Sequence, residues 1–115
     1  MPESFERGAL TEATFLILVS LCEPRHGYGV MQHINAMTNG RVNLGAGTLY
    51  GALNLLCEKG WISAEGAGER KKNYLITDEG KRAALNEMNR LFELMTIGRD
   101  SLFIDGFENK SERAN

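Results

Sequence analysis

The chain has 115 residues, of which 43% are apolar and 24% charged, with a formal net charge of −2. This is ordinary globular composition for one domain with its own core. The longest strongly apolar stretch, Ala13 to Cys22, is too short to cross a bilayer, and no basic region followed by an apolar core marks a signal sequence, so we expect a cytoplasmic protein without membrane contact.

Two helices are predicted in the first part of the chain. Thr11 and the acidic residue after it begin a helix whose residues 13–21 are apolar nearly all round and which should be buried on most sides, and Pro24 ends it. Residues 26–29, His-Gly-Tyr-Gly, predict a flexible turn. A second amphipathic helix follows, ended by an Asn-Gly pair; its apolar residues, spaced by three and four, are Val30, Met31, Ile34 and Met37.

A third helix is predicted after a linker of residues 41–45, and it opens Gly47-Thr48-Leu49-Tyr50. Its apolar face consists of Leu49, Ala52, Leu53 and Leu56. The outward face carries Tyr50, Asn54 and Glu58, and a phenol or an amide can contact DNA backbone or base edges. Gly47 and Thr48 suit a phosphate at the positive helix end. A packing role is the alternative for Tyr50.

Two short strands, residues 61–64 and 74–77, are predicted to form a hairpin around a glycine-containing loop. This loop carries Arg70, Lys71 and Lys72. Residues 41–77 sum to a charge of +2, whereas residues 1–40 and residues 78–115 each sum to −2. Positive charge is therefore concentrated near the third helix, where it could contact phosphate, although a solvated loop would show the same pattern.

A long helix is predicted from Thr77, its N-cap, to Gly98, with acidic residues in the first turn. Its apolar stripe consists of Leu85, Met88, Leu91, Phe92 and Met95. Such a stripe exceeds what a small head can cover, so we expect an identical partner to bury it; packing on its own head is the alternative. The tail that follows has an apolar island, residues 102–104 with Phe107, and is expected to be partly mobile.

This order of elements predicts a winged helix-turn-helix of the α+β class, mainly helical with a small β hairpin. We expect a single domain overall, divided into a DNA-binding head of residues 1–77, a dimerisation helix of residues 78–98 and a short tail of residues 99–115. The third helix would enter the major groove of double-stranded operator DNA, and the hairpin loop would contact phosphate.

The chain resembles the PadR-like transcriptional regulators over roughly residues 10–91. The residues that carry the resemblance are His26-Gly27-Tyr28, Gly47-Thr48-Leu49-Tyr50, Leu53, Leu56, Gly60, Ile62, Lys71-Lys72, Tyr74 and Thr77-Asp78-Glu79-Gly80. The resemblance implies a homodimeric repressor paired through the C-terminal helix with help from the first helix. It also places Tyr28 near the DNA backbone, where a hydrophobic staple is the alternative.

The short tail resembles that of the smaller branch of this family, in which some members bind flat aromatic compounds at the dimer centre. The candidates for dimer or effector contacts are Phe15, Leu85, Met88, Leu91, Phe92 and Met95. Methionine and phenylalanine together could form an adaptable apolar surface for a planar aromatic effector. Ordinary dimer packing is the simpler interpretation of the same residues.

Two rival functions are weaker. Cys22, His26, His33 and Cys57 could suggest a metal or thiol sensor, but Pro24 interrupts the helix and no CxxC pair is present, so we predict no metal, no cofactor and reduced core thiols. A winged helix could instead serve only protein contacts. No nucleophile pattern supports an enzyme. The sequence therefore predicts a DNA-binding transcriptional regulator.

Overall fold

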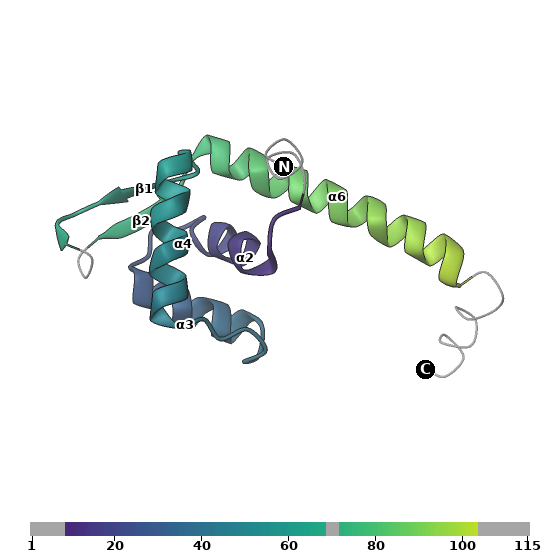
Figure 1. The fold of residues 1–115 in the computed structure, drawn as a ribbon, viewed down its shortest axis with the longest axis horizontal. Coiled ribbons are helices and arrows are strands. Elements are labelled where there is room, and N and C mark those ends of the chain that lie inside the picture. The colour runs from purple at the N-terminus through teal and green to yellow at the C-terminus, as the bar shows by residue number, and fades with distance from the viewer. Residues whose placement is uncertain (1–8, 69–71, 104–115) are drawn as a thin grey trace.

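The computed structural model describes residues 9–68 and 72–103, which form four helices and one two-stranded antiparallel sheet. Figure 1 shows the last helix extending away from a head that contains the other helices and the hairpin. Within the described residues, no helix combines the length and the apolarity that a membrane span needs. In chain order the elements are α2 (Glu12–Ser20), α3 (Gly27–Met37), α4 (Ala46–Lys59), β1 (Ile62–Glu65), β2 (Asn73–Ile76) and α6 (Asp78–Leu102).

The start of α2 is confirmed, because the Thr11 side chain accepts a hydrogen bond from the Thr14 N–H at 3.1 Å. Ile17 and Leu18 are fully buried, as expected for a helix that is apolar nearly all round. The predicted turn at residues 26–29 is wrong beyond His26. His26 is the N-cap of α3, and its carbonyl already accepts the first helical hydrogen bond, so the two glycines that suggested a turn lie inside the helix.

Helix α4 contributes the centre of the core through Leu49, Leu53 and Leu56, which are buried on the predicted face. The helix ends at Gly60, whose φ of 79° is the left-handed conformation that glycine adopts without strain. The chain can therefore turn directly from α4 into the hairpin.

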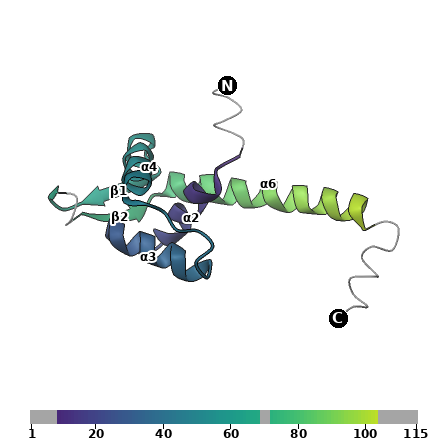
Figure 2. The same cartoon turned by 60° about the horizontal axis from the view of Figure 1, so that its bottom comes forward.

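The hairpin confirms both predicted strands to within one residue. Ile62 pairs with Ile76, and Ala64 pairs with Tyr74, in antiparallel register. Tyr74 also exchanges two backbone hydrogen bonds with Arg25, at 2.9 and 3.1 Å, on its other side. The segment between α2 and α3 thus pairs with the hairpin, and Figure 2 shows the hairpin lying at the same end of the head as the start of α3.

Helix α6 begins as predicted, because the Thr77 side chain accepts a hydrogen bond from the Gly80 N–H at 3.1 Å. The predicted end at Gly98 is wrong, since the helix continues to Leu102. A single glycine does not interrupt a helix when the residues around it keep their hydrogen bonds. Leu102 therefore belongs to α6, and residues 104–107 of the predicted apolar island lie outside the described residues.

Glu87 of α6 is buried in the corner between α6 and the segment before α2, with only 4% of it exposed. Its carboxylate accepts a hydrogen bond from the Leu10 N–H at 3.1 Å and two from Arg90, at 3.0 and 2.6 Å. The Arg90 hydrogen bond, with help from the Leu10 N–H, lowers the pKa of Glu87 below its ordinary value, against the effect of burial. A buried charge is thus paired and hydrogen-bonded.

Replacing Gly80 by alanine should destabilise the protein by about 1–3 kcal/mol, because the added Cβ would overlap the carbonyl oxygen of Trp61. Gly51→Ala is the matched control, since its Cβ would enter open space in α4. This control should stabilise the helix by about 0.5–1 kcal/mol. Urea unfolding at one protein concentration measures both changes. A Gly80→Ala variant as stable as wild type would contradict the packing.

Protonation of Glu87 at low pH should lower the free energy of unfolding of the protein. Because its folded pKa lies below the ordinary value of 4.5, the ionised carboxylate contributes stability that is fully present above about pH 4.5 and is lost as pH falls through the folded pKa. Glu87→Gln does not titrate, so the variant should lose less free energy of unfolding than wild type between pH 6 and pH 3. Parallel curves for the two proteins would refute this role.

Candidate nucleic-acid interface

The start of α4 lies open at the surface of the head. Gly47 and Thr48 are exposed, and the N-cap, Gly45, provides no side-chain hydrogen bond to the first turn. The N–H groups of this turn carry the positive end of the helix dipole. Asn54 is exposed two turns further along. An anion could therefore bind at the helix start, while the amide of Asn54 is free to reach a base edge.

Tyr50 does not point outward as predicted. Its side chain is half-buried against the core, and its ring lies over Gly27 so closely that a Cβ at Gly27 would come within 2.5 Å of the hydroxyl oxygen. The position of Tyr50 agrees with the alternative interpretation of its role, which is packing. Gly27 has no side chain, and this leaves the space that the Tyr50 ring occupies. A contact between the Tyr50 hydroxyl and DNA stays a prediction.

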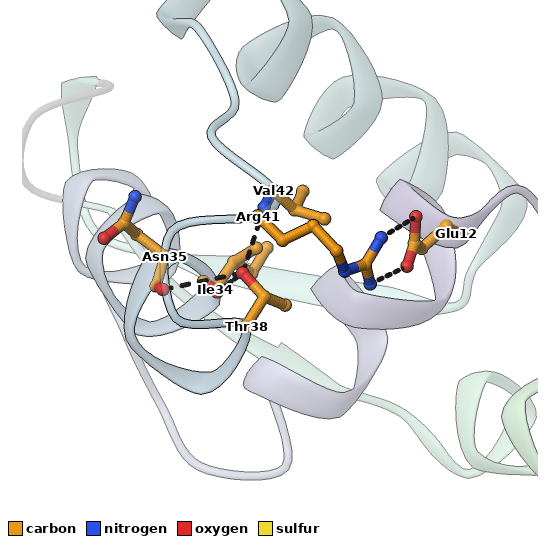
Figure 3. A network of polar contacts seen from close by, with 6 residues as sticks. All are labelled: Glu12, Ile34, Asn35, Thr38, Arg41 and Val42. Carbon is orange, nitrogen blue, oxygen red and sulfur yellow. Dashed lines mark hydrogen bonds and ion pairs between the residues drawn. The ribbon is translucent and has the colours of Figure 1, made fainter.

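The linker between α3 and α4 is held by polar contacts, which Figure 3 shows. The Thr38 hydroxyl donates to the Ile34 carbonyl at 2.8 Å and accepts from the Val42 N–H at 3.0 Å. The Arg41 guanidinium pairs with both carboxylate oxygens of Glu12 in the first turn of α2 and so lowers the pKa of Glu12. These contacts fix the path by which the chain enters α4.

The hairpin loop is only partly described. Arg70 and Lys71, two of the three predicted phosphate contacts, lie outside the described residues. Lys72 directly precedes β2, and its carbonyl oxygen lies 2.9 Å from Nδ1 of His26. A carbonyl only accepts, so Nδ1 must carry the proton. His26 therefore attaches the returning end of the loop to the start of α3, a role that sequence reasoning missed.

Tyr28 is 64% exposed on the first turn of α3. A shallow depression beside it, of about 350 Å³, is lined by Met31 and three polar residues, Gln32, Asn35 and Asn43. This exposure does not fit a hydrophobic staple, which would be packed against its own helix. Contact between Tyr28 and a DNA backbone stays a prediction that the exposed position permits.

The cysteines differ from each other. The expectation of a core thiol is wrong for Cys22, which is exposed because α2 ends before it. Cys57 is half-buried in α4; burial raises its pKa, and the positive charge of Lys72 partly opposes that shift. Among the residues that the structure describes, no group of three or more His, Cys, Asp or Glu side chains could hold a metal ion.

Helix α6 packs on the head only through its first part, where Gly80, Ala84 and Glu87 are buried. Packing on its own head therefore does not account for the rest of the helix. We call the exposed side chains that share one side of this helix the apolar face of α6: Leu85, Met88, Leu91, Phe92, Met95 and Leu102. The predicted stripe makes up most of this face. Leu94 and Ile97 are also exposed, but they lie off the face.

A depression of about 420 Å³ lies where α2 meets α6. Phe15, which is half-buried, lines it together with Leu10, Leu16 and Leu91, and the buried Glu87 lies at its edge. The structure therefore brings Phe15 close to one residue of the predicted stripe.

Known proteins share this architecture. A PadR family transcriptional regulator from Eggerthella lenta is 26% identical, with a TM-score of 0.60 over 81% of this chain and 82% of that chain. A transcriptional regulator from Clostridium thermocellum is 21% identical, with a TM-score of 0.66 over 78% of this chain and 91% of that chain. RosR of H. salinarum is 22% identical, with a TM-score of 0.62 over 91% and 87%. No curated protein matches this chain.

The last two similarities concern the fold alone, and they confirm the winged helix. The family is shown by the model of the transcriptional regulator PadR-like family, which matches residues 15–86. The chain therefore belongs to the PadR-like family of transcriptional regulators. Members of such a family are generally not enzymes, which agrees with the function class that the sequence predicted.

Proposed function

We propose that this chain is a homodimeric repressor that binds operator DNA sequence-specifically. Helix α4 enters the major groove, the hairpin loop contacts phosphate, and α6 pairs with a second copy. The observation that carries the proposal is the open start of α4, whose first-turn residues are exposed, in a head whose α4 leads at its other end into the hairpin. Repression, as opposed to activation, rests on the family resemblance.

The charges near α4 support DNA as the ligand. Residues 46–57 carry no charged side chain, so nothing acidic in this part of α4 repels phosphate. Lys72 stands at the returning end of the loop and Thr48 at the start of the helix. Phosphate contacts from these two residues would fix the register, and Asn54 would read a base.

The apolar face of α6 supports the dimer. Soluble monomers rarely expose a continuous apolar surface of this kind, and burying one such large side chain contributes about 1.5–3 kcal/mol. Phe92 is 67% exposed in the single chain, so a partner helix packed against it would remove a large apolar surface from water. A two-fold symmetric pair would present two copies of α4 about 34 Å apart, which is one turn of DNA.

The depression beside Phe15 is the proposed place for a planar aromatic effector, should the dimer leave it open. Dimer packing is the simpler use of the same side chains. A compound that binds the folded dimer there would raise its melting temperature, and the rise would grow with the logarithm of the compound's concentration once that exceeds the Kd. No response to planar aromatic compounds would leave dimer packing as the role of Phe15.

A protein-docking role is the rival function, and Leu55 is its best support. This residue is 49% exposed on α4, next to Asn54. Leu55 lines a depression of only about 40 Å³ with Leu10 and Trp61, which is a small apolar surface for a protein partner. Selection from random duplex DNA separates the two functions, since a folded dimer that enriches no sequence would favour protein docking.

Asn54→Ala should relax the operator preference at one or two base pairs, each by about 1–3 kcal/mol, because a bidentate amide contact is lost. Lys72→Ala should instead weaken binding to all sequences and reduce the slope of log affinity against log salt by about 0.9. The measurement is sequence selection followed by titration at several salt concentrations. Asn86→Ala, on the exposed polar side of α6, is the control and should match wild type.

Phe92→Glu should convert the dimer into a monomer, because a charge would have to be buried against the partner. Light scattering after size exclusion, at micromolar concentration, measures this. Leu55→Glu is the matched control, since it also replaces an exposed apolar residue by a charge, but on α4, and it should stay dimeric. A wild-type monomer under these conditions would remove the dimer from the proposal.

A further inference from the structure

Helix α6 is attached to the head at its start. The Thr77 hydroxyl donates to the carbonyl of Gly60 at 2.6 Å, and the Thr77 N–H donates to the carbonyl of Trp61 at 3.0 Å. Gly60 is the C-cap of α4, and its N–H donates to Cys57 inside that helix. The first residue before α6 is therefore bonded directly to the end of α4.

The second attachment is Glu87, ten residues further along and so about 15 Å from the first along the helix axis. Its carboxylate accepts the Leu10 N–H at 3.1 Å, just before α2, and Arg90 holds it in place. No side chain beyond Arg90 is buried within the described part of α6. Thr77 and Glu87 are therefore the two hydrogen-bonded attachments of α6 to the head, and the buried Gly80 and Ala84 lie between them.

We propose that Thr77 and Glu87 are positioning residues that set the angle between α6 and α4, and thereby the separation of the two operator half sites that the dimer accepts. This inference rests on the proposed function, since it needs a dimer paired through α6 and bound to DNA through α4. Neither residue contacts DNA; each acts through the direction of α6.

The lever arm makes the effect measurable. A displacement of about 1 Å at Glu87, with the Thr77 end fixed, tilts α6 by about 4°, because the two attachments are about 15 Å apart. Leu102 ends the helix about 37 Å from its start and would move by about 2.5 Å. Relative to the paired α6 helices, a 4° turn about Thr77 would move the start of α4, about 20 Å from Gly60, by about 1.3 Å in each protomer. The two copies of α4 would then shift relative to each other by up to about 2.7 Å, which is most of one base-pair step of about 3.4 Å.

The experiment measures affinity against half-site spacing. The operator enriched by wild type is made with its half sites moved by −2 to +2 base pairs, and a duplex with a single half site is added. Wild type should bind one spacing at least tenfold more tightly than its neighbours. Glu87→Ala should reduce this preference to less than threefold or move the optimum, with the affinity for the single half site unchanged.

Two further variants test the first attachment and guard against poor folding of Glu87→Ala. Thr77→Val lacks the hydroxyl that bonds Gly60 and should also lose the spacing preference, whereas Thr77→Ser keeps a hydroxyl and should retain it. Glu93→Ala is the matched control for Glu87, because it removes an exposed carboxylate from the same helix and should behave as wild type.

The inference is overturned if the folded, dimeric variants of Glu87 and Thr77 keep the wild-type optimum and its discrimination. It is also overturned if they lose affinity equally at every spacing and for the single half site, which would indicate a purely structural role. A wild-type dimer that binds no DNA gives a different result, because it removes the proposed function itself.

Discussion

The hydrogen bonds of Thr77 are the constraint on which the arrangement of the molecule depends. This one residue ends the hairpin, caps α6 and bonds the residues that follow α4. Gly80 then allows the helix to pass against the Trp61 carbonyl. Because three elements meet at one threonine, the end of α4 cannot move far without moving the start of α6. A change in the direction of α6 is therefore transmitted through the Thr77 hydrogen bonds to α4, the helix proposed to read DNA.

The head has to satisfy two opposing demands on α4. Leu49, Leu53 and Leu56 fill the core from one face, while the start of the helix stays open to solvent. Contacts outside α4 resolve this conflict. Tyr50 packs over Gly27, and the Arg41 pair with Glu12 fixes the linker. The position of α4 is thus fixed by packing on its inner side and by the linker before its first residue. No residue on its outer side is needed for this purpose.

Much of the fold was predictable because its signals are local. The cap at Thr77, the spacing of the α4 leucines and the two short strands each lie within a few neighbouring residues. The two wrong boundaries also have a local cause: glycine predicts a turn at residues 27–29 and a helix end at Gly98, but helical hydrogen bonds continue through both places. Contacts between residues far apart in the chain produce no local sequence pattern from which they could be predicted. His26 meets Lys72 across 46 residues, and Glu87 meets Leu10 across 77.

The contact between His26 and the Lys72 carbonyl has one more consequence. The proton donated to the carbonyl is on Nδ1, so one tautomer of the ring holds the returning end of the loop against the residue that precedes α3. Arg25, the neighbour of His26, exchanges two backbone hydrogen bonds with Tyr74 of β2. The strand that leads out of the loop is therefore bonded to the entry of α3 at two neighbouring positions, so the hairpin and the start of α3 move as one unit.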